Sequence, residues 1–454
     1  MDMKIVDNIL ISIDNTEEEK VIIPEGVVGI ARGVFRDTAF TEITIPDSID
    51  SIGEYAFAYC RQLSELHLPE GLKQIGKGAF RGCESLRELE LPATVAVIED
   101  DAFSFCKNLK SIALPTGIAA VSQGLFEGCR SLAAVSLPDT VTTIADGAFK
   151  DCVSLPEISL PERIVSIGDY AFCNCHSLPS IHLSHDLVSI GRYAFRNCKK
   201  IHSFDLPEGL ESIGAWAFAY CKSLKAIKIP AGITRIHNHT FLYCEALASV
   251  ELPETLVYIG SSAFAYCHSL AAIDLPAAVT QIGEGAFSNC KALTGIVLPE
   301  NMDEIGAHAF SQCSELAEVV IPARVRHIEE GVFRECKALT HITLPEHLLR
   351  IGSWAFYGCD GLKTVALPRT LAEIGDHTFQ SCHNLATVTI PGSVRRVGKY
   401  ALANCESLTF VDLNFGINQI DDYAFQNCGK LYKATVPATV NKVGANIFHG
   451  CKTL

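Results

Sequence analysis

Cysteine offers the most reactive chemistry in this chain, because a thiolate can bind metal ions, form disulfides or act as a nucleophile. The 454 residues include nineteen cysteines, and eighteen of them, from Cys60 to Cys451, recur at intervals of 23 residues. A slot filled identically in every interval is typical of a small buried side chain. Stacked strands would hold neighbouring Cβ atoms about 4.8 Å apart, outside the roughly 3.5–4.5 Å range of a disulfide. We therefore expect reduced thiols in a packed interior.

Cys173 departs from this series, and with Cys175 and His176 it spells CNCH, the spacing of a candidate metal pair. Cys175 belongs to the regular series and should point inward, whereas Cys173 should point outward into solvent. Two ligands on opposite sides of the chain cannot share one ion. The sequence therefore predicts no metal site.

Acid–base catalysis would need paired carboxylates or a histidine held in a pocket. Glu88 and Glu90 are two residues apart on an expected strand, but an open strand gives no reason for a shifted pKa. The fifteen histidines are scattered, and no hydrolase, metalloprotease or phosphate-binding motif appears. We predict a protein that is not an enzyme and binds no cofactor.

A strict repeat positions these residues. A proline recurs every 23 residues from Pro46 to Pro437, with Ser184 and Asn414 as the two substitutes. If the proline is position 0, apolar residues recur at positions 3, 6, 10, 11, 14, 17, 20 and 22, and position 11 is Phe in every repeat except for Leu402. Self-similarity of this kind indicates a stacked array of repeats.

Each repeat is predicted to contain two extended pieces and one helical piece. Positions 17–22 alternate between apolar and polar residues like a strand with one buried face, and the following proline ends that strand. Positions 3–6 form a second short strand, often followed by a glycine such as Gly53 or Gly76 that would permit a tight bend. The Ala, Phe and Cys at positions 10, 11 and 14 are spaced as if on one or two helical turns.

The consensus LPxxLxxIGxxAFxxCxxLxxLxL resembles the BspA-type leucine-rich repeat, and the resemblance covers the chain from Val21 to Leu454. It implies an α/β repeat fold, a right-handed leucine-rich-repeat solenoid with a parallel β-sheet along the concave face and short second strands and helical turns on the other sides. The family occurs in surface proteins of bacteria and some parasitic protists. The resemblance thus implies adhesion or protein recognition at a cell surface, and it supplies no catalytic residues.

The domain organisation follows from where the period holds. Residues 1–20 do not fit it, whereas Val21–Ile23 match positions 20–22 of a repeat. The alternation in 8–14 with turn residues Asp14 and Asn15 predicts an N-terminal cap hairpin over residues 1–23. Residues 24–454 are predicted to form a solenoid of 19 units of 22–23 residues, the last one incomplete, and we hypothesise that the chain is a fragment. Met1 is not followed by a signal peptide, so a cytoplasmic location is the alternative to the cell surface.

Composition narrows the class of partner. The chain carries 37 basic and 52 acidic residues and a net charge of −15, which argues against nucleic acid, because phosphate binding needs a basic face. No segment approaches the roughly 20 apolar residues of a membrane span. We expect a monomer whose partner is a protein or glycoprotein.

Two surfaces are candidates for binding that partner. Strand positions 19 and 21 are predicted to line the concave face, and the candidates there are Glu65, His67, Glu88, Glu90, Glu157, His182, Asp205, Lys228, Glu251 and Asp274. Aromatic residues gather instead at positions 9 and 13, where the candidates are Trp216, Tyr220, Tyr243 and Tyr266. The strand residues could equally be ordinary solvent-facing positions, and the rings could stack on one another instead of forming a carbohydrate or peptide platform.

The predicted function is a non-catalytic scaffold for protein recognition or adhesion. A structural spacer that holds another module, and an intracellular interaction solenoid, are the alternatives. The reduced cysteines are compatible with an intracellular protein.

Overall fold

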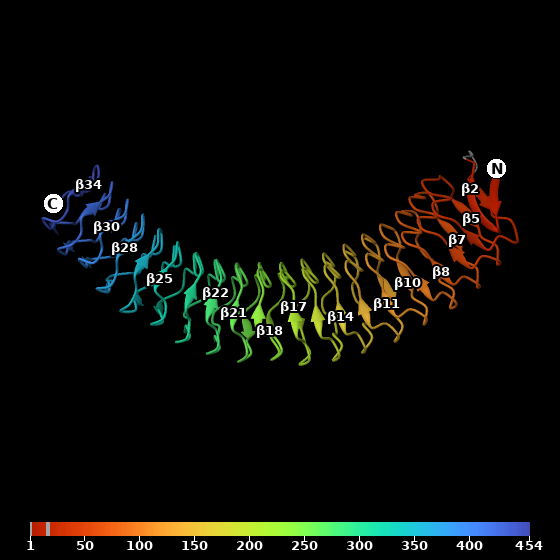
Figure 1. The fold of residues 1–454 in the computed structure, drawn as a ribbon, viewed down its shortest axis with the longest axis horizontal. Helices are drawn as coiled ribbons and strands as arrows, with labels where there is room; N and C mark the ends of the chain where they lie inside the picture. The colour runs from red at the N-terminus through yellow and green to blue at the C-terminus, as the bar shows by residue number, and fades with distance from the viewer. Residues whose placement is uncertain (1, 15–18) are drawn as a thin grey trace. The chain divides into compact units, whose positions relative to one another are not determined.

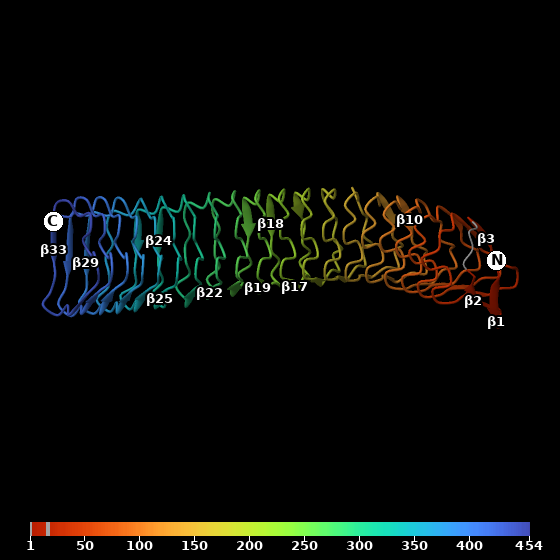
Figure 2. The ribbon, with the colours of Figure 1, turned by 90° about the horizontal axis from the view of Figure 1, so that it is seen from above.

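The computed structural model describes residues 2–14 and 19–454, and their contacts divide the chain into two compact halves, Met1–Leu224 and Lys225–Leu454. Each half is a stack of coils, one coil per repeat (Figure 1). Every coil places its strands at the same two positions, so that each half carries two columns of parallel strands, seen as separate rows in Figure 2. Each half therefore has the fold of a parallel β-solenoid.

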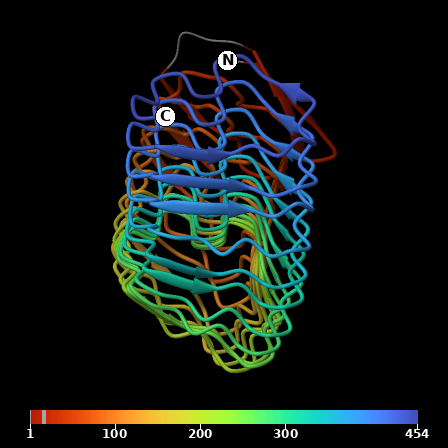
Figure 3. The ribbon, with the colours of Figure 1, turned by 90° about the vertical axis from the view of Figure 1, so that its left-hand side faces the viewer.

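The first column contains repeat positions 19–22 and has mainly three-residue strands. In the N-terminal half these are β3 (Lys20–Ile22), β5 (Glu42–Thr44), β7 (Glu65–His67), β10 (Ser111–Ala113), β12 (Ala134–Ser136) and β16 (Ser203–Phe204). In the C-terminal half they are β18 (Ala226–Lys228), β20 (Ser249–Glu251), β24 (Glu318–Val320), β26 (His341–Thr343), β29 (Thr387–Ile390), β31 (Phe410–Leu413) and β33 (Lys433–Thr435). The arrows of the last of these lie parallel in Figure 3.

The second column contains positions 5 and 6 and has two-residue strands. In the N-terminal half these are β4 (Gly29–Ile30), β6 (Ser51–Ile52), β8 (Gln74–Ile75), β9 (Val97–Ile98), β11 (Ala120–Val121), β13 (Thr143–Ile144), β14 (Ser166–Ile167), β15 (Ser189–Ile190) and β17 (Ser212–Ile213). In the C-terminal half they are β19 (Arg235–Ile236), β21 (Tyr258–Ile259), β22 (Gln281–Ile282), β23 (Glu304–Ile305), β25 (His327–Ile328), β27 (Arg350–Ile351), β28 (Glu373–Ile374), β30 (Arg396–Val397), β32 (Gln419–Ile420) and β34 (Lys442–Val443). Partners in both columns are usually 23 residues apart, as Ser166 and Ser189 are, which matches the sequence period.

An antiparallel pair precedes the first coil. β1 (Met3–Val6) pairs with β2 (Ile9–Ile13) through a turn at Asp7 and Asn8, both with positive φ, and β2 then pairs in parallel with β4. Part of the segment expected to turn, beginning at Asn15, lies outside the described residues. The cap and the division of the chain into 1–23 and 24–454 remain predictions.

A column of phenylalanines forms the core of each half. The rings from Phe35 to Phe218 in the N-terminal half, and from Phe241 to Phe379 in the C-terminal half, stack on their neighbours at centroid separations of 5.1–5.9 Å. The fully buried ring of each coil is therefore covered by the rings of the coils before and after it. One coil alone could not bury this surface, so the coils stabilise one another.

The cysteine column is buried beside the phenylalanines and has its own hydrogen-bonding role. The Sγ atom of Cys83 donates to the carbonyl of Phe57 in the preceding coil at 3.2 Å, and the same carbonyl accepts the backbone N–H of Cys60. The same contact recurs along both halves, for example from Cys198 to Phe172. A thiol is thus a small apolar side chain that also satisfies a buried carbonyl.

The helical turns predicted at positions 8–14 are wrong. The described residues contain no helix, and this segment is a series of tight turns in which positions 9 and 13 both have positive φ, as in Tyr55 (55°) and Tyr59 (61°). A left-handed residue every fourth position breaks a right-handed helix. The turn segment instead donates alternate N–H groups to the next coil, from Tyr55 to Lys77 O and from Phe57 to Ala79 O, each at 2.8 Å.

The glycine at position 7 is explained by close packing of the backbone. Gly53 and Gly76 have ordinary φ, so the predicted need for a tight bend is not the reason for glycine. A Cβ on Gly53 would lie 2.6 Å from the carbonyl oxygen of Ile30 in the preceding coil, and one on Gly76 would lie 2.8 Å from the nitrogen of Glu54. Glycine permits neighbouring coils to approach at this corner.

The ring stack predicts a large loss of stability when one ring is removed. Phe287 is fully buried between Phe264 and Phe310, so Phe287→Ala should lower the free energy of unfolding by about 3–5 kcal/mol. Urea denaturation followed by circular dichroism measures this. The exposed Val165 provides a control, since Val165→Ala should change little. Equal effects of the two substitutions would contradict a shared core.

The turn geometry predicts strain where a glycine is replaced at position 9. Gly147 has φ of +62° and no atom within 4 Å of an added Cβ, so only backbone conformation opposes an alanine there. Gly147→Ala should lower the free energy of unfolding by about 1–2 kcal/mol. Gly71→Ala, at a position without positive φ in the same half, is the control and should be nearly neutral. Thermal unfolding of the two variants measures the difference. A neutral Gly147→Ala would rule out the left-handed turn.

Candidate functional site

The strand face is the set of exposed side chains at positions 19 and 21 on the first column of strands. Alternation within each strand buries position 20 in the core and turns positions 19 and 21 outward, as in β7, where Leu66 is buried between exposed Glu65 and His67. The structure exposes all ten residues predicted for this face, namely Glu65, His67, Glu88, Glu90, Glu157, His182, Asp205, Lys228, Glu251 and Asp274. That they bind a partner remains a prediction.

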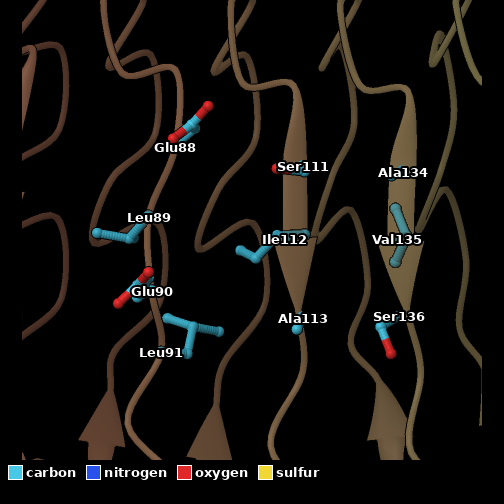
Figure 4. Close-up of a pocket in the computed structure, with 10 residues that line it drawn as sticks. All are labelled: Glu88, Leu89, Glu90, Leu91, Ser111, Ile112, Ala113, Ala134, Val135 and Ser136. Atoms are coloured by element: carbon cyan, nitrogen blue, oxygen red, sulfur yellow. The ribbon is translucent and has the colours of Figure 1, made fainter.

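A groove in the N-terminal half forms a hollow on this face. It has a volume of about 630 Å³ and lies over three neighbouring coils. Figure 4 shows the carboxylates of Glu88 and Glu90 beside the short side chains of the next two strands. Those side chains, Ser111, Ala113, Ala134 and Ser136, are all exposed and small. The groove exists because four successive strand-face positions carry almost no side-chain volume.

The sheet is interrupted at the acidic end of this groove. Residues 88–90 form no strand and contact the next coil through a single bridge between Glu88 and Ser111. A second hollow of about 550 Å³ lies on the other side of the two glutamates, next to His67 and Glu70. Glu88 and Glu90 therefore stand between two hollows.

The negative charge of the groove favours binding of a positively charged group. Across residues 2–14 and 19–454, no ion pair is formed by Glu88 or Glu90, and Glu70, which lines the second hollow, adds further negative charge. Elsewhere on the strand face, His182 contacts Glu162 at 3.2 Å, with both side chains largely exposed. Exposed pairs of this kind contribute little to stability.

The aromatic candidates stack within their own halves. The Tyr243 and Tyr266 rings lie 4.2 Å apart at 10°, and Trp216 stacks on Tyr193 at 5.6 Å. Tyr220 lies under the guanidinium of Arg196 at 5.3 Å. The expected stacking of rings on one another is therefore confirmed for Trp216, Tyr243 and Tyr266. Stacked rings cover each other's faces and present mainly their edges, which makes them a poor platform for a sugar ring.

The prediction that Cys173 is exposed is wrong. Its side chain is 2% exposed, because small side chains at position 12 are covered by the next coil, as Ala58 and Ala219 also are. Burial raises the pKa of Cys173, and the neighbouring Arg196 opposes that shift. In the part of the chain that the structure describes, no group of three or more His, Cys, Asp or Glu side chains is placed to hold a metal ion.

Two residues missed by the sequence analysis extend the strand face in the C-terminal half. Val297 and Val320 occupy position 21 in adjacent coils and are 82% and 63% exposed. The signal was present in the sequence, since the other repeats of this half carry polar or small residues at that position. Both valines depart from the period without contributing to the packed core.

Comparison with known proteins identifies the family. A model of the BspA type leucine rich repeat region matches residues 28–155, 119–248, 217–340 and 326–454. The chain belongs to the BspA-type leucine-rich repeat family. No curated protein matches it. Members of this family are leucine-rich-repeat scaffolds, and the fold described above is that of the family.

Several solved structures are similar to this BspA-type chain. A leucine-rich repeat protein from Bacteroides ovatus is 29% identical, with 75% of this chain and 82% of that chain covered and a TM-score of 0.63. A leucine rich cell surface protein from Faecalibacterium prausnitzii is 22% identical, covering 96% and 93%, with a TM-score of 0.40. A leucine rich repeat protein from T. pallidum is 37% identical over 36% of this chain and 75% of that chain, with a TM-score of 0.33. The described residues include no helix long and apolar enough to cross a membrane.

The cysteine column predicts a large difference in thiol reactivity. Burial raises the pKa of Cys106, Cys313 and Cys405 to about 12, whereas the hydrogen bond from Cys428 lowers the pKa of half-buried Cys451 to about 7. Because the thiolate is the reactive form, iodoacetamide should label Cys451 first, at a rate that is half-maximal near pH 7 and levels off only above it. Peptide mapping by mass spectrometry measures the order. Rapid labelling of the three buried thiols in the folded protein would contradict their burial.

Proposed function

We propose that this BspA-type protein is a non-catalytic scaffold that recognises a protein or glycoprotein through its strand face. The observation that carries the proposal is the groove at Glu88 and Glu90, where two carboxylates without ion pairs among the described residues border a hollow with a floor of small side chains. Recognition of an extended, positively charged segment suits that shape and charge. The strand face is also separate from the core, so its residues can serve binding without cost to the fold.

The cell surface is the proposed location, and it is supported by membership of a family that occurs in microbial surface proteins. Binding as a monomer is the simplest arrangement, since a long strand face can distribute affinity over several coils. A structural spacer remains the competing proposal, but a spacer needs no acidic groove. The lateral aromatics Trp216, Tyr220, Tyr243 and Tyr266 are the less favoured binding surface, because ring stacking accounts for their positions.

Charge reversal in the groove tests the proposed function. A random linear peptide library displayed on phage would be selected against the immobilised chain, and the enriched peptides would be synthesised and titrated by fluorescence polarisation. The double substitution Glu88→Lys with Glu90→Lys should weaken basic peptides by about tenfold or more, because attraction becomes repulsion.

The control carries the same change of charge away from the groove. Glu211→Lys with Glu304→Lys reverses two exposed carboxylates beside the second column of strands and should leave peptide affinity unchanged. Failure to enrich any peptide that discriminates between the two variants would favour the spacer.

A further inference from the structure

The C-terminal half carries an exposed apolar step on its strand face, made by Val297 and Val320. Gly295 bridges to Glu318 in parallel register, so Val297 and Val320, two residues further on, lie opposite each other on adjacent coils. Valine has a strong preference for burial, yet these side chains are 82% and 63% exposed. Packing within the coil explains neither residue, since position 21 points away from the core.

A hollow adjoins this step. It has a volume of about 480 Å³ and is lined by Leu298, Val320, Ile321, Pro322, Ala323 and Pro345, with Glu300 and Asn301 at its edge. Gly295 leaves the other side of the step open, because no atom lies within 4 Å of where its Cβ would be. An apolar side chain that entered the hollow would contact both its lining and the exposed valines.

The charges around the step specify the partner further. Glu300, Glu318 and Asp274 are exposed, and none of the three takes part in an ion pair within the described residues. Asp274 occupies position 21 in the coil before Val297, so a carboxylate and two valines follow one another along the stack. A partner must therefore present positive charge next to its apolar group.

We propose that Val297, Val320 and the adjoining hollow bind an extended protein segment in which a large aliphatic or aromatic side chain is flanked by lysine or arginine. The apolar side chain enters the hollow and covers the valines, and the basic side chain meets Glu300, Glu318 or Asp274. This inference rests on the proposed function of the strand face and adds a second, chemically distinct binding site to it. Burial of both valines provides affinity, and the carboxylates select against acidic segments.

Peptides enriched from the phage library on the wild-type chain provide the test. Val297→Thr with Val320→Thr keeps the shape of the side chains and replaces one methyl group of each with a hydroxyl, and Glu300→Gln with Glu318→Gln removes the charge. Both changes are on exposed residues, so the thermal melting temperature should stay within about one degree of wild type. We expect a class of peptides with an apolar residue beside Lys or Arg whose Kd rises about tenfold or more with the threonine pair.

The same peptides should weaken severalfold with the glutamine pair and should be unaffected by Glu88→Lys with Glu90→Lys. Peptides that depend only on Glu88 and Glu90 would support recognition by the strand face and overturn the valine site. If no enriched peptide lost affinity with either the valine or the groove variants, both the valine site and the proposed function would be contradicted.

Discussion

The stacking of one phenylalanine ring on the next is the interaction on which the rest of the structure depends. A coil of 23 residues has too little interior to bury its own apolar side chains, so its ring must be covered by the coils on either side. In the N-terminal half the first pair, Phe35 and Phe57, lies 5.1 Å apart and nearly parallel at 3°. This spacing is close to the separation of hydrogen-bonded strands. Ring stacking and strand pairing therefore impose the same repeat distance.

The position of the ring determines what the neighbouring residues must be. The carbonyl of Phe57 lies in the interior and accepts the backbone N–H of Cys60 in its own coil and the thiol of Cys83 in the next coil, and the same pattern recurs along each half. Alanine in place of cysteine at position 14 would leave a small cavity and would remove the hydrogen bond from the thiol to the phenylalanine carbonyl. Left-handed residues at positions 9 and 13 stand on either side of the ring, and alternate N–H groups of this segment donate to the next coil. Glycine, asparagine and aromatic residues at those positions serve this geometry.

The strand face is free of these demands, and that freedom is why we propose it as the binding surface. Position 20 belongs to the core, while positions 19 and 21 contact neither the ring column nor the cysteines. Their residues differ from coil to coil, from Glu88 and Glu90 to Ser111 and Ala113 and then to Val297 and Val320. Acidic, small and apolar stretches thus follow one another on a constant scaffold. A partner that contacts the strand-face residues of several neighbouring coils would gain affinity from each coil without needing a pocket in the core.

The sequence was sufficient to predict the fold, because the period places every apolar residue in one of a few slots. The buried phenylalanines and cysteines, both strand columns and the exposure of the strand-face residues all follow from it. Helical turns were predicted wrongly because Ala, Phe and Cys at positions 10, 11 and 14 also fit a helix. The frequent glycine and asparagine at positions 9 and 13, such as Gly78 and Asn174, were the evidence for left-handed turns. The burial of Cys173 and the grooves depend on contacts between coils, which the pattern of a single repeat does not contain.

Hydrogen exchange of the phenylalanine amides tests the shared column most directly. The N–H groups of Phe103, Phe149 and Phe264 each donate to the next coil, at 3.1, 2.8 and 2.8 Å, in the buried interior. Exchange in deuterated buffer, resolved by fragmentation and mass spectrometry, should show these amides protected to a similar degree and far more slowly exchanging than the exposed segment around Glu25. Exchange of the phenylalanine amides at the rate of an unfolded chain would contradict the account.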